Sequence, residues 1–188
     1  MPTRLQTWIA VPLATMAIVL GARVTVDLPG TDIETTLQTL AVFLAGGWLG
    51  PWRGMAAVVL YLALGAVGLP VYADGGAGLA HLFGPTSGYL FGFIACAGVV
   101  GALWRGHEPT VLRAVGLPLL ATALVLVLGV PVLAWRAEMP LGEAVEKGGL
   151  APLPGGLLKA VVTTLLLLGE ARWLRVGAGH GPAGDAAR

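Results

Sequence analysis

The segment VLRAVGLPLLATALVLVLGVPVLAW, residues 111–135, decides the fold class, because it is long enough to cross a bilayer and carries one charged residue, Arg113. A membrane helix needs about 20 predominantly apolar residues. The rest of the chain has the same character: 56% of its 188 residues are hydrophobic, 11% are charged, and the mean hydropathy is +0.84. Soluble domains carry about 25% charged residues. The composition therefore predicts an integral membrane protein.

Further apolar runs, broken by Pro, Gly and charged residues, predict one all-α domain over residues 1–188. Six transmembrane helices are expected in this single bundle, at about Thr7–Val26, Leu37–Leu49, Met55–Leu69, Tyr89–Trp104, Val111–Trp135 and Leu157–Leu174. Residues 176–188 are expected to form a disordered tail. Arg4 and the apolar Trp8–Leu20 also imitate a secretory signal, but the apolar sequence downstream favours a first membrane helix.

The distribution of basic residues predicts how the bundle is oriented, because cytoplasmic loops carry an excess of Lys and Arg. One side holds seven of them: Arg4, Arg53, Arg105, Arg113, Arg172, Arg175 and Arg188. The other side holds Arg23, Arg136 and Lys147, with Lys159 at its rim. The first side is therefore expected to be cytoplasmic. Both termini are then expected in the cytoplasm, and the chain is expected to be a multi-pass protein of the plasma membrane.

Several function classes find no support in the sequence. Basic residues are scattered, which disfavours a nucleic-acid partner, and there is no phosphate-binding loop, HExxH motif or GxSxG elbow. The three histidines lie in separate loops or tails, and the single cysteine, Cys96, lies in an apolar run. We therefore expect no catalytic residues, no metal and no cofactor. A membrane enzyme or assembly protein is the least favoured interpretation.

Lys159 is the most unusual polar residue, because it opens an almost wholly apolar helix. A lysine near a helix end usually extends its ammonium group to the lipid headgroups. The start of a helix is already positive, however, and disfavours a cation by roughly 0.3–1 kcal/mol unless an anion joins it. Helix-end amides together with a lysine suit a carboxylate. We therefore favour an anionic ligand at Lys159.

Three other polar residues are expected at the same outer end, each with an alternative role. Gln38 opens the second helix and could bond a helix end instead of a ligand. Tyr89 opens the fourth helix and could be an interfacial anchor. Asp74 lies in a Gly-rich loop and could be a solvated acid. These residues and Lys159 form the candidate substrate-binding site.

Four motifs in a shared order resemble the BioY family, the substrate-binding (S) components of energy-coupling factor biotin transporters. They are TLQT at 36–39, LYLALGAVGLP at 60–70, GPTSGY at 84–89 and PGGLLKA at 154–160. The resemblance covers about residues 36–164. It implies a six-helix bundle with an outward-facing pocket for biotin, and gives Lys159 the place of the family's motif lysine near the ligand.

The resemblance also implies partners. Family members are driven by an energy-coupling transmembrane subunit and a pair of cytoplasmic ATPases, although some are thought to work without them. S components dock onto the transmembrane subunit through an Ala-x-x-x-Ala surface on the first helix. Ala10 and Ala14 match that surface here.

One departure from the family pattern bears on the ligand. The acid expected before the motif lysine is Gly156 in this chain. The cyclic urea of biotin has two N–H donors, and a buried donor without an acceptor costs about 1–3 kcal/mol. We expect Asp74 to replace the missing carboxylate, with Gly75 and Gly76 bringing backbone amides close to the ligand. The alternative is an S component for a different small anionic vitamin or precursor.

Overall fold

The computed structural model describes residues 4–26, 35–105 and 107–179. These residues are helical apart from loops and one antiparallel pair of two-residue strands. The elements are α1 (Arg4–Arg23), β1 (Thr25–Val26), β2 (Thr35–Thr36), α2 (Gln38–Leu49), α3 (Pro51–Ala66), the 3-10 helix η1 (Ala73–Gly75), α4 (Gly78–Leu82), α5 (Ser87–Trp104), α6 (Val111–Arg136), α7 (Leu141–Val145), the π-helix η2 (Glu146–Leu150) and α8 (Leu153–Gly179).

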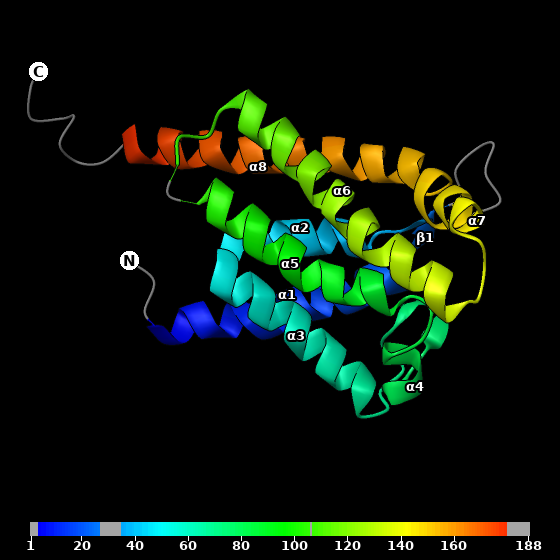
Figure 1. Ribbon diagram of the computed structural model, residues 1–188. Helices are drawn as coiled ribbons and strands as arrows, with labels where there is room; N and C mark the ends of the chain where they lie inside the picture. The colour runs from blue at the N-terminus through cyan, green and yellow to red at the C-terminus, as the bar shows by residue number, and fades with distance from the viewer. Residues whose placement is uncertain (1–3, 27–34, 106, 180–188) are drawn as a thin grey trace, which may run out of the picture.

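Six of the described helices, α1, α2, α3, α5, α6 and α8, form one bundle (Figure 1). The start of α1 and the end of α8 lie at the same end of it, while β1, α4 and α7 lie at the opposite end. The latter end, which we call the loop end, carries the segments that the basic-residue distribution places outside. The helical fold class is therefore confirmed, and each predicted helix has a counterpart.

Helix boundaries differ from the prediction where proline starts a helix. α3 begins at Pro51 because Gly50 takes a positive φ of 85° and turns the chain sharply after α2. α8 begins at Leu153, since Pro154 in its first turn needs no N–H partner there. At its other end α8 extends to Gly179, beyond the predicted start of the tail at residue 176, and residues 180–188 lie outside the described residues.

Glycines bring the helices into close contact. A Cβ added at Gly46 of α2 would lie 2.5 Å from the carbonyl oxygen of Ala97 in α5. A Cβ at Gly54 of α3 would lie 2.8 Å from the Cα of Gly46. Small residues at four-residue spacing let backbones approach in this way in membranes. Gly46 of α2 and Gly54 of α3 thus serve the packing of the bundle.

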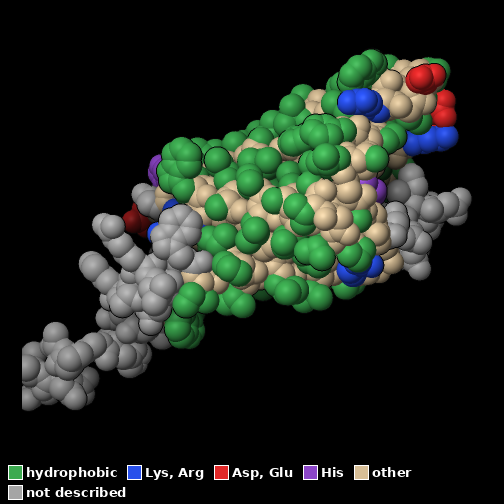
Figure 2. All heavy atoms as spheres, turned by 90° about the horizontal axis from the view of Figure 1, so that it is seen from below, with side chains coloured by type: hydrophobic (Ala, Val, Ile, Leu, Met, Phe, Trp, Pro, Cys, Tyr) green, Lys and Arg blue, Asp and Glu red, His purple; other side chains and the backbone are tan. Residues whose placement is uncertain are grey.

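The lateral surface of the bundle is apolar. Figure 2 shows a face covered mostly by hydrophobic side chains, with charged groups gathered towards its two ends. Among the described residues, three helical stretches are long and apolar enough to cross a membrane: Ser87–Trp104, Val111–Arg136 and Leu141–Trp173. Shorter apolar helices cover Ile9–Arg23, Gln38–Leu49 and Pro51–Ala66. These features are those of an integral membrane protein.

Candidate ligand-binding site

A cavity of about 380 Å³ opens at the loop end of the bundle. Pockets for small ligands have volumes of about 300–1,000 Å³ and mostly apolar walls with a few polar groups. The described residues that line it are Thr36, Gln38, Thr39, Tyr72, Ala73, His81, Thr86, Tyr89, Leu90, Phe93, Thr122, Val125, Leu126, Leu133, Gly148, Pro152, Leu153, Gly156 and Lys159. The cavity thus brings together Lys159, Gln38, Tyr89 and Gly156, all of which were predicted from the sequence.

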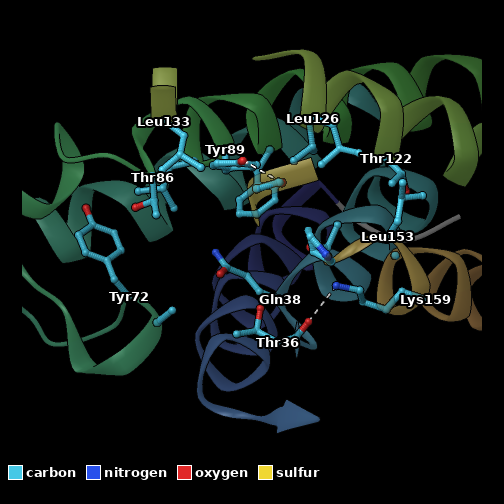
Figure 3. A pocket seen from close by; sticks show the side chains of 18 of the residues that line it. Thr36, Gln38, Tyr72, Thr86, Tyr89, Thr122, Leu126, Leu133, Leu153 and Lys159 are labelled. Carbon is cyan, nitrogen blue, oxygen red and sulfur yellow. Dashed lines mark hydrogen bonds between the residues drawn. The ribbon is translucent and has the colours of Figure 1, made fainter. Parts of the chain in front are cut away.

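Lys159 supplies the positive charge in this wall. Its side chain is half-buried, and its Nζ donates a hydrogen bond to the carbonyl oxygen of Thr36 over 3.1 Å (Figure 3). Lys147 forms an ion pair with Glu143, and Lys159 is in no ion pair with a described acid. An ammonium group has three donors. It therefore retains donors for an anion that enters the cavity.

The setting of Lys159 differs from the prediction in one respect. Because α8 begins at Leu153, Lys159 lies in the second turn of the helix instead of at its start. Even the amide of Gly156 is bonded, to the carbonyl oxygen of Pro152 at 3.0 Å. The expectation that unpaired helix-end amides surround Lys159 is therefore wrong. An anion at this position depends on the ammonium group itself.

Gln38 presents an unpartnered donor. The residue is 4% exposed, and its Nε2 atom makes no hydrogen bond of normal geometry, although the equally unpartnered hydroxyl of Tyr61 lies beside the Gln38 side chain. The N-cap residue of α2 is Leu37, and the described hydrogen bonds do not support the alternative that Gln38 bonds the helix end. In Figure 3 the carboxamide turns away from Lys159, towards the Tyr72 end of the cavity. A buried donor without a partner costs about 1–3 kcal/mol, so an acceptor on a ligand would be stabilising here.

Tyr89 has a largely structural part in the site. Its hydroxyl donates to the carbonyl oxygen of Gly148 over 2.9 Å, so η2 is tied to the start of α5. The ring is half-buried and fills space left by Gly129, where an added Cβ would clash with it. The ring faces the cavity, but the hydroxyl already has an acceptor. Tyr89 therefore shapes the cavity and fixes the π-helix that covers one side of it.

In the Gly-rich loop the two glycines do not contribute as expected, while the role of Asp74 stays a prediction. The backbone of Asp74 lies in η1, and its side chain lies outside the described residues. Gly75 and Gly76 are not among the residues that line the cavity, and their amides donate to the carbonyl oxygens of Tyr72 and Ala73. The expectation that these amides approach a ligand is therefore wrong, because the tight turn of η1 uses them itself.

Gly156 leaves one wall of the cavity without an acidic group. It is buried in the first turn of α8, and a Cβ added there would lie 3.3 Å from Cγ2 of Thr122. Gly156 has no side chain with which to accept a hydrogen bond. Any acceptor for ligand N–H groups must come from elsewhere in the cavity.

Two aromatic residues in the cavity wall were not predicted from the sequence as site residues. Tyr72 is fully buried, and its hydroxyl donates to the carbonyl oxygen of Leu62 over 2.7 Å. Burial raises the pKa of this hydroxyl, which keeps it a donor. His81 in α4 stacks on Tyr72 with ring centroids 5.0 Å apart. Gly65 makes room for the Tyr72 ring, because a Cβ added there would clash with the ring atoms.

A second hollow, of about 570 Å³, runs between α1 and α2. Ala10 and Ala14, predicted to dock a partner, are half-buried and line it together with Leu44 and Trp48. The other lining residues, which include Ala17, Gly21 and Ala41, are small or apolar too. The hollow is therefore a groove of the kind in which an apolar helix packs.

The fold and the cavity define a class: a helical membrane protein with a cavity of small-ligand size between the ends of its helices. Residues 1–176 match the model of the BioY family. The chain is 35% identical to the "Biotin transporter BioY" of Rhodobacter capsulatus over 164 residues, which cover 81% of this chain and 86% of the relative. The chain therefore belongs to the BioY family.

Other comparisons agree with this assignment. The chain is 34% identical to the "Probable biotin transporter BioY" of Bacillus subtilis, with 85% of this chain and 86% of that one covered. It also superposes on the crystal structure at 2.1 Å of the S-component for biotin from an ECF-type ABC transporter. The TM-score is 0.77 at 24% identity, over 93% of this chain and 95% of that one. The likeness confirms the fold.

Proposed function

We propose that the protein captures biotin at the outer face of the cell membrane and moves it inward together with an energy-coupling partner. Membership of the BioY family supports this function, since the relatives named above are biotin transporters. The single observation in this chain that carries it is Lys159, a half-buried ammonium group without a described acidic partner in a mostly apolar cavity.

The proposed binding mode follows the length of the cavity. The carboxylate of biotin would meet the ammonium group of Lys159, which exchanges the carbonyl of Thr36 for a charged acceptor or keeps both. The fused rings would lie further along the cavity, against apolar side chains such as Phe93 and Leu126. Gln38 would then donate its free N–H to the urea carbonyl.

We further propose that six helices span the membrane with both termini in the cytoplasm. The first and last described helices support this, because α1 starts and α8 ends at the same end of the bundle (Figure 1). The loop end with the cavity would then face outward. The groove that includes Ala10 and Ala14 would receive a helix of the energy-coupling transmembrane subunit, which acts with a pair of ATPases.

Uptake of labelled biotin by biotin-requiring cells tests the function. Cells that express this chain, alone and with an energy-coupling module, should accumulate label above cells with an empty vector. Absence of accumulation in both, with the protein present in the membrane, would contradict the proposal.

A second candidate is an S component for another small anionic vitamin or precursor, favoured by the absence of an acid at Gly156. Competition binding experiments distinguish the two candidate functions. Desthiobiotin, which keeps the cyclic urea and the carboxylate, should displace labelled biotin, and carboxylate vitamins without a cyclic urea should not. Stronger displacement by one of those vitamins would favour the second candidate.

A further inference from the structure

His81 is the one described histidine in the cavity wall. Its ring has a hydrogen-bond acceptor for the urea N–H groups of biotin, and Gly156 has none. Its ring lines the cavity, and neither ring nitrogen has a hydrogen bond within the described residues. A neutral imidazole has one N–H donor and one acceptor nitrogen. The side chain is half-buried, so it can meet a ligand and still be held in place.

Two neighbours hold the ring of His81 in one position. Tyr72 stacks on it at 5.0 Å with the planes 15° apart, and Tyr72 is itself fixed by its hydrogen bond to Leu62. On another side the ring occupies the space beside Gly76, where an added Cβ would collide with the ring atoms. Such a preorganised group loses little conformational entropy when it binds a ligand.

The position of this pair matches the shape of an elongated ligand. In Figure 3 Tyr72 and Lys159 lie at opposite ends of the labelled residues, and the carboxamide of Gln38 points towards the Tyr72 end. His81 stacks on Tyr72 and so belongs to that end. The cavity therefore has a cationic end at Lys159 and an aromatic, polar end at His81.

We propose that His81 is a specificity-determining residue: its acceptor nitrogen receives a hydrogen bond from an N–H of the ligand's cyclic urea. Together with the donor of Gln38, which suits the urea carbonyl, His81 forms a head-group subsite at the end of the cavity opposite Lys159. Gly156 lies one helical turn from Lys159, so this subsite supplies an acceptor at the other end of the cavity and not at the position of the missing acid. This inference rests on the proposed function, because it assumes a ligand with a cyclic urea.

His81→Phe is the principal test, because phenylalanine keeps a ring on Tyr72 and removes the acceptor. Equilibrium binding of labelled biotin to the purified protein should weaken on the order of 10- to 100-fold, the cost of leaving one buried donor unpaired. His81→Gln, which restores an acceptor, should recover most of the affinity. Leu79→Ala, an exposed position on the same helix α4, is the matched control and should bind like the wild type.

Gly76→Ala tests the same subsite without changing His81. The backbone at Gly76 has φ −58° and ψ 148°, which alanine adopts readily, so the change acts through the collision with the His81 ring. It should weaken biotin binding in the wild type and have little further effect in a His81→Ala background. Thermal unfolding of each variant shows whether the fold is kept.

Biotin analogues methylated at one or the other urea nitrogen identify the partner of His81. One analogue should bind the wild type more weakly than biotin, and this penalty should shrink in His81→Phe. The inference is overturned if His81→Phe binds biotin like the wild type, or if His81→Gln does not restore binding. It is also overturned if the loss of affinity from urea methylation is the same in His81→Phe as in the wild type. If the wild type shows no saturable biotin binding, the proposed function falls and takes the inference with it.

Discussion

At the scale of single residues, the account depends on the charge of Lys159. Replacing it with methionine keeps much of the apolar stem and removes the charge. We expect the variant to bind biotin about 10- to 100-fold more weakly, since a hydrogen bond to a charged group contributes about 1.5–3 kcal/mol. Biotin methyl ester should bind wild type and variant with similar affinity. Lys147→Met, which removes an exposed lysine paired to Glu143, is the control for charge. An unchanged affinity for biotin would contradict the assigned role.

The site was predictable from the sequence where a polar residue is chemically out of place. Lys159 stood out in an apolar helix, and Gln38 and Gly156 stood out within family motifs. Tyr72 and His81 did not, because their contact depends on the path of the chain between α3 and α4. Sequence spacing carries no information about such a tertiary contact.

At the scale of elements, the hydrogen bond from Tyr89 holds η2 over the cavity. Tyr89→Phe should loosen this π-helix and raise the dissociation rate of bound biotin several-fold, because a hydrogen bond of this kind contributes about 0.5–1.5 kcal/mol. Stopped-flow or filter-binding kinetics would measure the rate. Lys147→Ala, an exposed change in the same element, should leave the rate unchanged. Equal rates for Tyr89→Phe and wild type would show that η2 does not retain the ligand.

The contact between α2 and α5 makes a separate prediction about stability. Gly46→Ala places a Cβ against the carbonyl of Ala97 and should lower the stability of the folded bundle by about 1–3 kcal/mol. Gly116→Ala in α6 has no atom within 4 Å of the new Cβ and should be neutral or slightly stabilising, because alanine favours a helix. Thermal unfolding in detergent compares the two. A similar melting temperature for both would refute the close packing.

Most elements were predictable because apolar runs and their breakers mark helices reliably. The starts of α3 and α8 were harder to predict, since a proline can either end a helix or begin one. Only the turn at Gly50, with its positive φ, shows that α3 begins at Pro51. The start of α8 at Leu153 in turn moved Lys159 into the second turn.

At the scale of the whole molecule, binding and transport should be separable. Ala14→Leu would fill the groove between α1 and α2, and Ala14 is not among the residues that line the ligand cavity. We expect biotin affinity to be unchanged and partner-dependent uptake to fall at least several-fold, because the helix of the transmembrane subunit could no longer pack closely. Ala123→Leu, on the exposed face of α6, is the control. Normal uptake by Ala14→Leu would show that the partner docks elsewhere.

We propose that this chain alone forms the biotin site. Equilibrium binding of labelled biotin to the purified, detergent-solubilised protein tests it most directly. We expect saturable binding at one site per chain, displaced by desthiobiotin and strongly weakened by Lys159→Met. Folded protein that shows no saturable binding, or binding unaffected by that substitution, would contradict it.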